Sequence, residues 1–336
     1  MKKNIRFFCW FPILILAACS TESELHQILG TGAEAPVFLD CRPVSSTEMV
    51  FSFSTDVSVV SLNLDPAAEL DFIKNGSEVR VSFSKPLEEG IKITANILVE
   101  DDRRNTLNVI VPFRTRNDRM PRLVINELRT DFGSPRVEFV ELVALEAGNL
   151  SAMRLFIAGH SLTKPVYEFP QAEVAAGEYI VLHLRTLNED SLDETGQNLA
   201  LSPGNEAQDT ARDFWLPGNT KMLRKTDAIW LMDQDDRIID AVLLSEKQDA
   251  AWASETMAQA AAFLAGKNAW FDTDGTKPYE GWVPGPADAV ITAGATATRS
   301  VCRDESVIPG QRAGDWYITV TSGSSPGRQN NPRRHM

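Results

Sequence analysis

Cysteine and histidine are scarce in this sequence of 336 residues, which contains four of each. The cysteines form no CxxC pair, and the histidines show no HxxxH spacing. These absences argue against a zinc ribbon, a redox-active dithiol and a metalloprotease helix. Because a phosphate-binding loop and a dinucleotide fingerprint are also missing, we expect no metal site and no cofactor.

Positive charge is scarce as well, since 33 Lys and Arg residues stand against 46 Asp and Glu residues and the formal net charge is −13. An acidic surface repels phosphate, so we expect no nucleic-acid partner. With 43% hydrophobic and 24% charged residues, the composition is that of a folded protein. The length is sufficient for two domains, each with its own core.

The N-terminus has the pattern of a bacterial export signal. Three positive residues, Lys2, Lys3 and Arg6, precede an apolar run at 7–16. This run of about ten residues is too short to span a bilayer. The segment 16–19 (LAAC) resembles the lipobox of bacterial lipoproteins. An ordinary secretory signal that happens to have a cysteine at its cleavage site is the alternative.

The lipobox resemblance implies a signal peptide at 1–18 and lipidation of Cys19, with diacylglycerol on its thiol and an acyl chain such as palmitate on its new amino terminus. The polar segment 19–35 would then be a tether between the membrane and the folded part. Ser20 provides no acidic cue for retention in the inner membrane. We therefore expect a lipid anchor in the cell envelope, in the outer membrane, facing the periplasm or the cell surface.

The segment 36–116 is rich in short runs that alternate apolar and polar residues, as at 49–54, 79–83 and 91–95. This period of two predicts half-buried strands, and Asn75-Gly76 predicts a tight hairpin turn between two of them. The stretches 51–57, 85–90 and 99–107 resemble bacterial Ig-like repeats of surface proteins. The resemblance implies a β-sandwich that acts as a spacer.

A second series of strand-like runs fills 121–331, after a polar linker at 114–121. The runs at 125–128, 137–142 and 169–184 and a hairpin at 227–242 resemble the lamin tail domain, an Ig-like β-sandwich, and the closing segments 298–301, 314–316 and 325–330 fit it too. Two insertions, about 188–222 and 246–297, depart from that family. The expected fold is mainly β, with two Ig-like β-sandwich domains in tandem and a helical insertion in the second.

The insertion at 246–297 contains a predicted helix. Ser245 and Gln248 have the spacing of a capping box, and Gly266 is a typical helix end. One apolar stripe at helical spacing is formed by Ala253, Met257, Ala260, Ala261 and Leu264. We expect this helix to pack on the sandwich; contact with a partner helix or a membrane is the alternative.

The stretch 268–285 concentrates aromatic residues among Gly, Pro and Asp. Trp270, Phe271, Tyr279 and Trp282 are candidate ligand-binding residues, because aromatic rings in a loop can bind sugar rings or a partner protein. Packing of the same rings between the insertion and the core is the alternative. Asp272 and Asp274 leave a loose calcium site open, although the full EF-hand pattern is absent.

No catalytic residue is assigned. Glu127, Glu138 and Glu141 fall on neighbouring predicted strands, but the odd spacing of the last two places them on opposite faces, and we expect solvated sheet faces. The GSSPG sequence at 323–327 matches a nucleophile elbow only in pattern, because Pro326 stands where a helix must begin and no acid lies between Ser325 and His335. Cys41 and Cys302 either pair or remain separate buried thiols.

The function expected from these patterns is that of a membrane-anchored envelope or surface lipoprotein. It would act as a binding or structural module that recognises an envelope or host protein or a glycan, without catalytic activity. The membrane would be a partner through the N-terminal lipid. The alternative is a metal-assisted hydrolase that uses acidic loops of the second domain.

Overall fold

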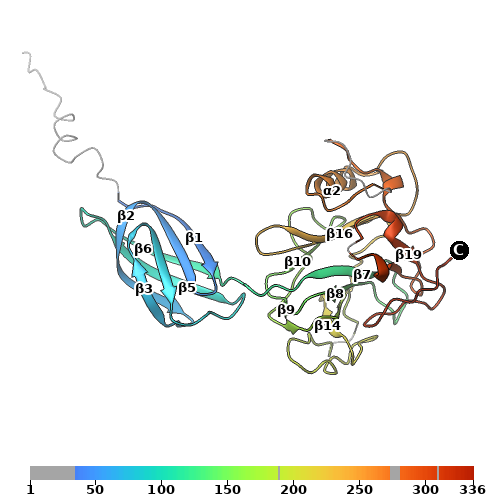
Figure 1. Cartoon of the computed structure of the whole chain (residues 1–336), viewed down its shortest axis with the longest axis horizontal. Coiled ribbons are helices and arrows are strands. Elements are labelled where there is room, and N and C mark those ends of the chain that lie inside the picture. The colour runs from blue at the N-terminus through green and yellow to red at the C-terminus, as the bar shows by residue number, and fades with distance from the viewer. Residues whose placement is uncertain (1–34, 188–189, 273–280, 309) are drawn as a thin grey trace, which may run out of the picture.

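The computed structural model describes residues 35–187, 190–272, 281–308 and 310–336. Strands dominate, and the described residues form one α-helix, α2 (Glu255–Gly266), so the expected mainly β class is confirmed. Two lobes follow one another along the chain (Figure 1). The described part of the chain contains no helix with the length and apolar character needed to cross a membrane.

The first lobe contains six strands around one hydrophobic cluster. They are β1 (Phe38–Ser45), β2 (Glu48–Asp65), β3 (Leu70–Lys74), β4 (Gly76–Phe83), β5 (Lys92–Glu100) and β6 (Thr106–Arg114). The first part of β2 pairs with β1 and β4, and its second part pairs with β5, so this strand passes from one layer to the other. Alternate residues of β4 and β5 are buried, such as Val79 and Val81, as period-two patterning requires.

The second lobe contains the remaining strands, in two larger sheets and one two-stranded ribbon. One sheet has the order β11 (Tyr167–Glu168), β10 (Arg154–Ile157), β15 (Asp227–Met232), β16 (Ile238–Ser245) and β17 (Val290–Ile291). The other has the order β14 (Arg212–Trp215), β13 (Tyr179–His183), β8 (Phe139–Ala144), β7 (Leu123–Arg129), β18 (Val301–Arg303) and β19 (Trp316–Ile318). The ribbon pairs β9 (Gly148–Asn149) with β12 (Glu173–Val174).

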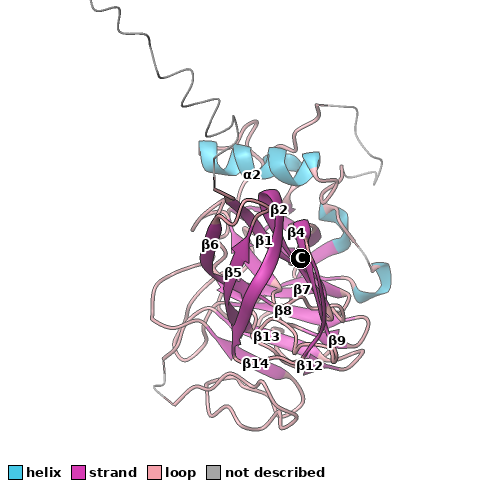
Figure 2. Ribbon diagram, turned by 90° about the vertical axis from the view of Figure 1, so that its left-hand side faces the viewer, coloured by secondary structure: helices cyan, strands magenta, loops and turns pink. Residues whose placement is uncertain are grey.

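A single large hydrophobic cluster contains residues of both sheets and of α2. The helix packs against β15, lies next to β16 in Figure 1 and at the outer edge of the strands in Figure 2, and buries Met257, Ala260, Ala261 and Leu264. Three short 3-10 helices complete the lobe: η1 (Pro286–Asp288), η2 (Glu305–Val307) and η3 (Ala313–Asp315). The segment 188–222, expected as an insertion, supplies β14, which pairs with β13 in parallel and extends the second sheet.

The second sheet is buried on both faces, which the sequence did not lead us to expect. Every residue of β7 and β8 is buried, including Glu127 and Glu141, and Glu138 just before β8 is buried as well. The expectation of solvated faces for these three carboxylates is therefore wrong. The face turned away from the hydrophobic cluster is covered by the loop 204–211 and by the C-terminal segment 322–331, which hydrogen-bond to it.

Candidate functional site

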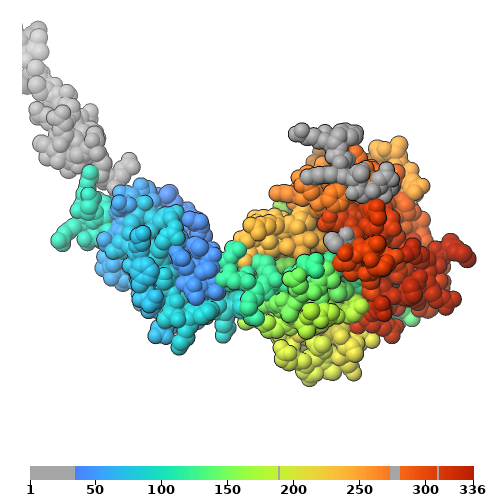
Figure 3. Space-filling model, viewed as in Figure 1, coloured from blue at the N-terminus to red at the C-terminus, as the bar shows by residue number. Residues whose placement is uncertain are grey.

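The two lobes are joined by a segment that is firmly held by hydrogen bonds. Asn117 is buried and donates through its side-chain amide to the carbonyls of Asn149 and Ser151, at 2.7 and 2.9 Å. Its backbone exchanges two hydrogen bonds with the side chain of Gln234, at 2.9 and 2.8 Å. Arg116 forms a bidentate ion pair with Asp235, with N–O distances of 2.8 and 2.7 Å. The lobes therefore meet in a defined arrangement at a narrow waist (Figure 3).

A cavity of about 790 Å³ lies at this waist. Both lobes line it, together with the linker: Arg42, Pro43, Val44, Arg114, Thr115, Arg116, Ala152, Arg154, Glu168, Gln234, Asp235 and Arg237. Its volume falls within the range of roughly 300–1,000 Å³ that is typical of ligand pockets, and such pockets favour domain junctions. We call it the junction cavity.

The junction cavity is positively charged, although the protein as a whole is acidic. Its lining has five arginines and two carboxylates, and two carboxylates just outside the lining, Glu78 and Asp236, pair with Arg42 and Arg154, so one positive charge is left without a partner among the described residues. Arg114 pairs with Glu168 at 2.8 Å and Arg154 pairs with Asp236 at 2.8 Å, and both guanidinium groups keep further N–H donors. A concave site lined by one sign of charge focuses the electric field and attracts ligands of opposite charge.

Arg237 is the arginine with the most donors available to a ligand. It is exposed on the turn between β15 and β16, and its side chain makes no hydrogen bond or ion pair with any described residue. The hydrogen bond from Arg116 lowers the pKa of Asp235, and the charges of Arg116 and Arg237 add to this effect. Asp235 is therefore ionised at neutral pH and holds Arg116 in the cavity wall.

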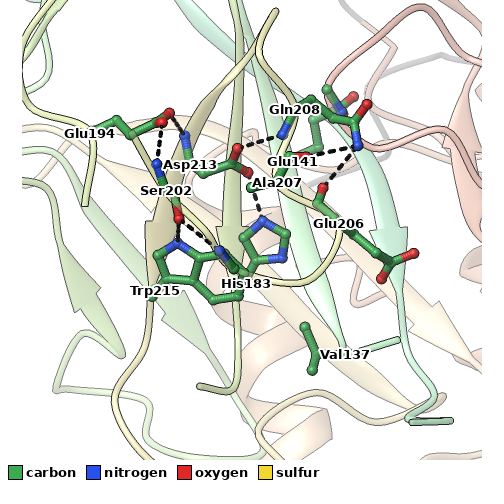
Figure 4. Close-up of polar contacts among 12 residues, drawn as sticks. Val137, Glu141, His183, Glu194, Ser202, Glu206, Ala207, Gln208, Asp213 and Trp215 are labelled. Atoms are coloured by element: carbon green, nitrogen blue, oxygen red, sulfur yellow. Dashed lines mark hydrogen bonds and ion pairs between the residues drawn. The ribbon is translucent and has the colours of Figure 1, made fainter. Parts of the chain in front are cut away.

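On the covered face of the second sheet, His183 of β13 and Asp213 of β14 form a buried pair (Figure 4). The His183 Nε2 lies 2.7 Å from Asp213 Oδ1, and the Trp215 ring stacks on the imidazole with 3.8 Å between centroids. The second oxygen of Asp213 accepts from the Gln208 backbone N–H at 2.9 Å. This pair therefore ties the loop 204–211 to the sheet.

The His183–Asp213 pair has the geometry of a general base and its orienting acid, but no substrate can reach it. Both side chains are fully buried, and the His183 Nδ1 is also buried, without a hydrogen-bond partner. A general base must lie within hydrogen-bond reach of the proton that it abstracts. The arrangement supports a structural role.

Two carboxylates on the same face hold the C-terminal segment. Glu127 accepts from the Ser325 backbone N–H at 2.9 Å and from the Ser324 hydroxyl at 3.1 Å. Glu141 accepts from the Gly327 backbone N–H at 2.6 Å and from the Asn126 amide at 2.9 Å. Burial, and secondly the charge of Glu127, raise the pKa of Glu141 well above 4.5.

The raised pKa of Glu141 predicts that stability falls as pH rises. Above pH 4.5 the unfolded chain releases this proton while the folded chain keeps it, so folding loses up to about 1.4 kcal/mol per pH unit until the folded pKa is reached. We expect Glu141→Gln to remove this slope, measured by urea unfolding from about pH 5 to about pH 8. Glu146→Gln, at an exposed side chain, is the matched control. Equal slopes in wild type and Glu141→Gln would contradict the assignment.

The aromatic residues expected to bind a ligand do not form one exposed platform. Trp270 is buried in the large hydrophobic cluster, and its indole N–H donates to the Asp288 carbonyl at 2.9 Å, so the interpretation of this residue as an exposed recognition residue is corrected. Trp282 is half-buried and packs against the same cluster, and Phe271 is half-buried. Tyr279 lies outside the described residues. The core-packing alternative holds for Trp270.

The other sequence candidates are separated in space or lie outside the described residues. Cys41 and Cys302 are both free thiols, the first beside the first-lobe cluster and the second buried in the second lobe. Among the described residues, no group of three or more His, Cys, Asp and Glu side chains is arranged to hold a metal ion. Cys19 and Asp274 lie outside the described residues, whereas Asp272 is described.

The junction cavity was not predicted from the sequence. Its arginines come from segments that are far apart in the chain, between positions 42 and 237, and no local motif joins them. The one sequence cue is the basic run Arg114, Arg116 and Arg119, which was interpreted only as a linker. In an acidic chain, three arginines within six residues indicate a local positive site.

Comparisons with known proteins found a family model, a sequence relative and a solved structure. The family model described as TP_1001_2nd, protein second domain, matches residues 121–318. An uncharacterised protein of Treponema pallidum (strain Nichols) is 30% identical over 243 residues, which is 68% of this chain; the chain spans 61% of the length of that relative. A crystal structure of a DUF4876 family protein from Bacteroides thetaiotaomicron aligns with this chain at a TM-score of 0.28 and 12% sequence identity. The alignment covers 84% of this chain and 91% of that protein.

Proposed function

The chain belongs to the TP_1001 second-domain family, and we propose that it is a lipid-anchored envelope lipoprotein that binds an anionic partner at the junction cavity and catalyses no reaction. In this proposal the first lobe is a bacterial Ig-like spacer and the second a lamin-tail-like β-sandwich with a helical insertion. The partner is an envelope or host protein, or a glycan, that presents carboxylate or sulfate groups.

The observation that carries the proposal is the excess of arginine in the junction cavity. The chain has a formal charge of −13, which repels anions elsewhere, whereas this concave site gathers five arginines and leaves the charge of Arg237 without a partner among the described residues. An anionic partner is therefore attracted to this site. Guanidinium groups also bind carboxylate and sulfate groups in a bidentate manner, which gives specificity as well as attraction.

The structure of the junction supports binding over catalysis. Four of the five arginines of its wall are fixed by ion pairs, such as Arg116 with Asp235 and Arg114 with Glu168. Such a wall is already formed before a partner arrives, so binding immobilises few further side chains. The lining has no histidine, cysteine or serine, and its Thr115 hydroxyl and its two carboxylates are already held by hydrogen bonds or ion pairs.

The lipobox resemblance at 16–19 supports the location. An exported protein with a lipid on Cys19 and a polar tether at 19–35 would keep the junction cavity away from the bilayer. The anionic lipids of a membrane would then compete little for its arginines.

The proposal predicts that removing two cavity arginines weakens partner binding. We expect Arg42→Gln/Arg237→Gln to weaken capture of a partner from intact cells by residues 20–336 at least tenfold, because both side chains are largely exposed and their loss leaves the fold intact. Wild-type capture should also fall as salt concentration rises, since exposed charges are screened.

The matched control is Arg122→Gln/Arg333→Gln, which removes the same charge from exposed positions outside the cavity. This control should capture the partner as well as the wild type does. Equal capture by Arg42→Gln/Arg237→Gln and by wild type would overturn the assignment of the binding site.

A further inference from the structure

A second cavity lies on the covered face of the second sheet, at the opposite end of β7 from the junction. Arg114 and Arg116 precede β7, whereas Arg129 ends it, so the strand separates the two cavities by roughly 20 Å at about 3.3 Å per residue. The second cavity has a volume of about 250 Å³. Its lining is polar: Arg129, Arg136, Glu206, Gln208, Thr298, Ser322, Ser324, Pro326 and Arg328.

A buried arginine forms the back of this cavity. The Arg129 side chain is 1% exposed and pairs with both carboxylate oxygens of Glu206, and its Nη2 also donates to the Ser324 hydroxyl at 2.8 Å. Its guanidinium stacks over the Phe139 ring, with 4.8 Å from Cζ to the centroid. Arg129 therefore stays in place whether or not a ligand is present.

The remaining two arginines of the cavity are available to a ligand. Arg136 and Arg328 are exposed, and the side chain of neither makes a hydrogen bond or ion pair with any described residue. With Arg129 they bring three positive charges to a lining that has one carboxylate, Glu206, which is already bound to Arg129. The cavity thus has a surplus of two positive charges at its open side.

The buried polar network holds the walls of this cavity in position. Asp213, bound to His183, accepts the Gln208 backbone N–H, and the Gln208 amide bonds back to the Glu206 carbonyl at 3.1 Å (Figure 4). On the other wall, Glu127 holds the Ser324 hydroxyl at 3.1 Å. Both walls are therefore preorganised, which lowers the entropic cost of binding.

We propose that this cavity binds one tetrahedral oxyanion, a phosphate or sulfate group, between Arg136 and Arg328. Its volume lies below the range of roughly 300–1,000 Å³ for whole ligands, so the cavity suits a small anion or a single charged group of a larger molecule. The planar guanidinium fork matches the oxygens of phosphate and sulfate, and the Thr298 hydroxyl in the lining is a further donor.

The test is calorimetric titration of residues 20–336 with inorganic phosphate, sulfate and acetate at constant ionic strength. We expect phosphate and sulfate to bind at least tenfold more tightly than acetate, and Arg136→Gln/Arg328→Gln to weaken their binding at least tenfold. Arg122→Gln/Arg333→Gln should bind as wild type does. Equal binding of phosphate by wild type and by Arg136→Gln/Arg328→Gln would overturn the site, and acetate binding as tightly as phosphate would overturn the ligand class.

A second titration, with glycerol 3-phosphate, distinguishes a free ion from an esterified group. Tighter binding of the ester than of inorganic phosphate would identify the cavity as a subsite for a phosphorylated or sulfated molecule. Weaker binding of the ester would identify a site for the free ion. Arg42→Gln/Arg237→Gln should leave both titrations unchanged, so a failure of the junction-cavity proposal and a failure of this one give different results.

Discussion

Asp240→Ala is expected to lower the free energy of unfolding of the second lobe by about 3–5 kcal/mol, because it leaves a buried guanidinium without its counter-charge. Asp240 and Arg303 are 1% and 0% exposed, and Arg303 Nη2 lies 2.5 Å from Asp240 Oδ2. The same carboxylate oxygen accepts from the Ile125 backbone N–H at 2.7 Å, so it links β16, β18 and β7 across the two sheets. Burial raises the pKa of Asp240 although Arg303 acts in the opposite direction.

Urea unfolding followed by tryptophan fluorescence measures this effect in the second lobe alone, because no tryptophan lies between residues 35 and 120. The matched control is Glu146→Ala, which removes an exposed ion pair with Arg122 in the same lobe and should change the free energy of unfolding by about 1 kcal/mol or less. A loss below about 1 kcal/mol for Asp240→Ala would show that the buried pair does not act as a unit.

The strand pattern of the first lobe was predictable, because its sheets have one buried and one exposed face. Val79, Val81 and Phe83 alternate with polar residues in the sequence, and the structure buries all three. The turn between β3 and β4 was predicted less well. Lys74 pairs with Arg80, so the β3–β4 pairing does not close in the two-residue turn expected at Asn75-Gly76. The start of β4, from Gly76 to Val79, pairs with β2 instead.

The end of the helix and most of its apolar stripe agree with the prediction, but the helix begins later in the chain than predicted. Gly266 ends α2, and Met257, Ala260, Ala261 and Leu264 are buried as expected, whereas Ala253 of the predicted stripe is exposed and precedes the helix. The N-cap is Ser254, whose hydroxyl accepts from the Met257 backbone N–H at 3.2 Å, whereas Ser245 ends β16. Serine is a favoured N-cap residue at either position, but Ser245 belongs to β16, so the helix can begin only after that strand and is capped by Ser254.

The polar face of the second sheet could not be predicted from local sequence. Glu127 and Glu141 look like solvent-facing residues of alternating strands, and their partners, Ser325 and Gly327, lie 198 and 186 residues away in the chain. Burial of a carboxylate depends on whether a distant segment covers it and donates hydrogen bonds. The second cavity, between Arg129 and the C-terminal segment, could not be predicted either, because it too forms only when that distant segment covers the sheet.

Cys19→Ala is expected to abolish lipid attachment and to leave an unprocessed precursor, because the proposed anchor depends on one thiol. Each buried methylene of an acyl chain contributes about 0.8 kcal/mol, and several chains on one residue give stable anchoring where one chain gives weak and reversible binding. Without the thiol, no diacylglycerol can be added, so the precursor should keep residues 1–18 and fail to incorporate palmitate. The measurement is metabolic labelling with palmitate, combined with partition between detergent and aqueous phases.

Cys9→Ala is the matched control, since Cys9 lies in the apolar run of the expected signal peptide and is removed with it. This variant should be labelled, processed and retained in the membrane as the wild type is. Labelling of Cys19→Ala at the wild-type level would show that the lipid is attached elsewhere, and the lipobox interpretation would be wrong. Processing of Cys19→Ala without labelling would instead indicate an ordinary secretory signal, and the junction cavity would then act in a protein that is free to diffuse in the envelope.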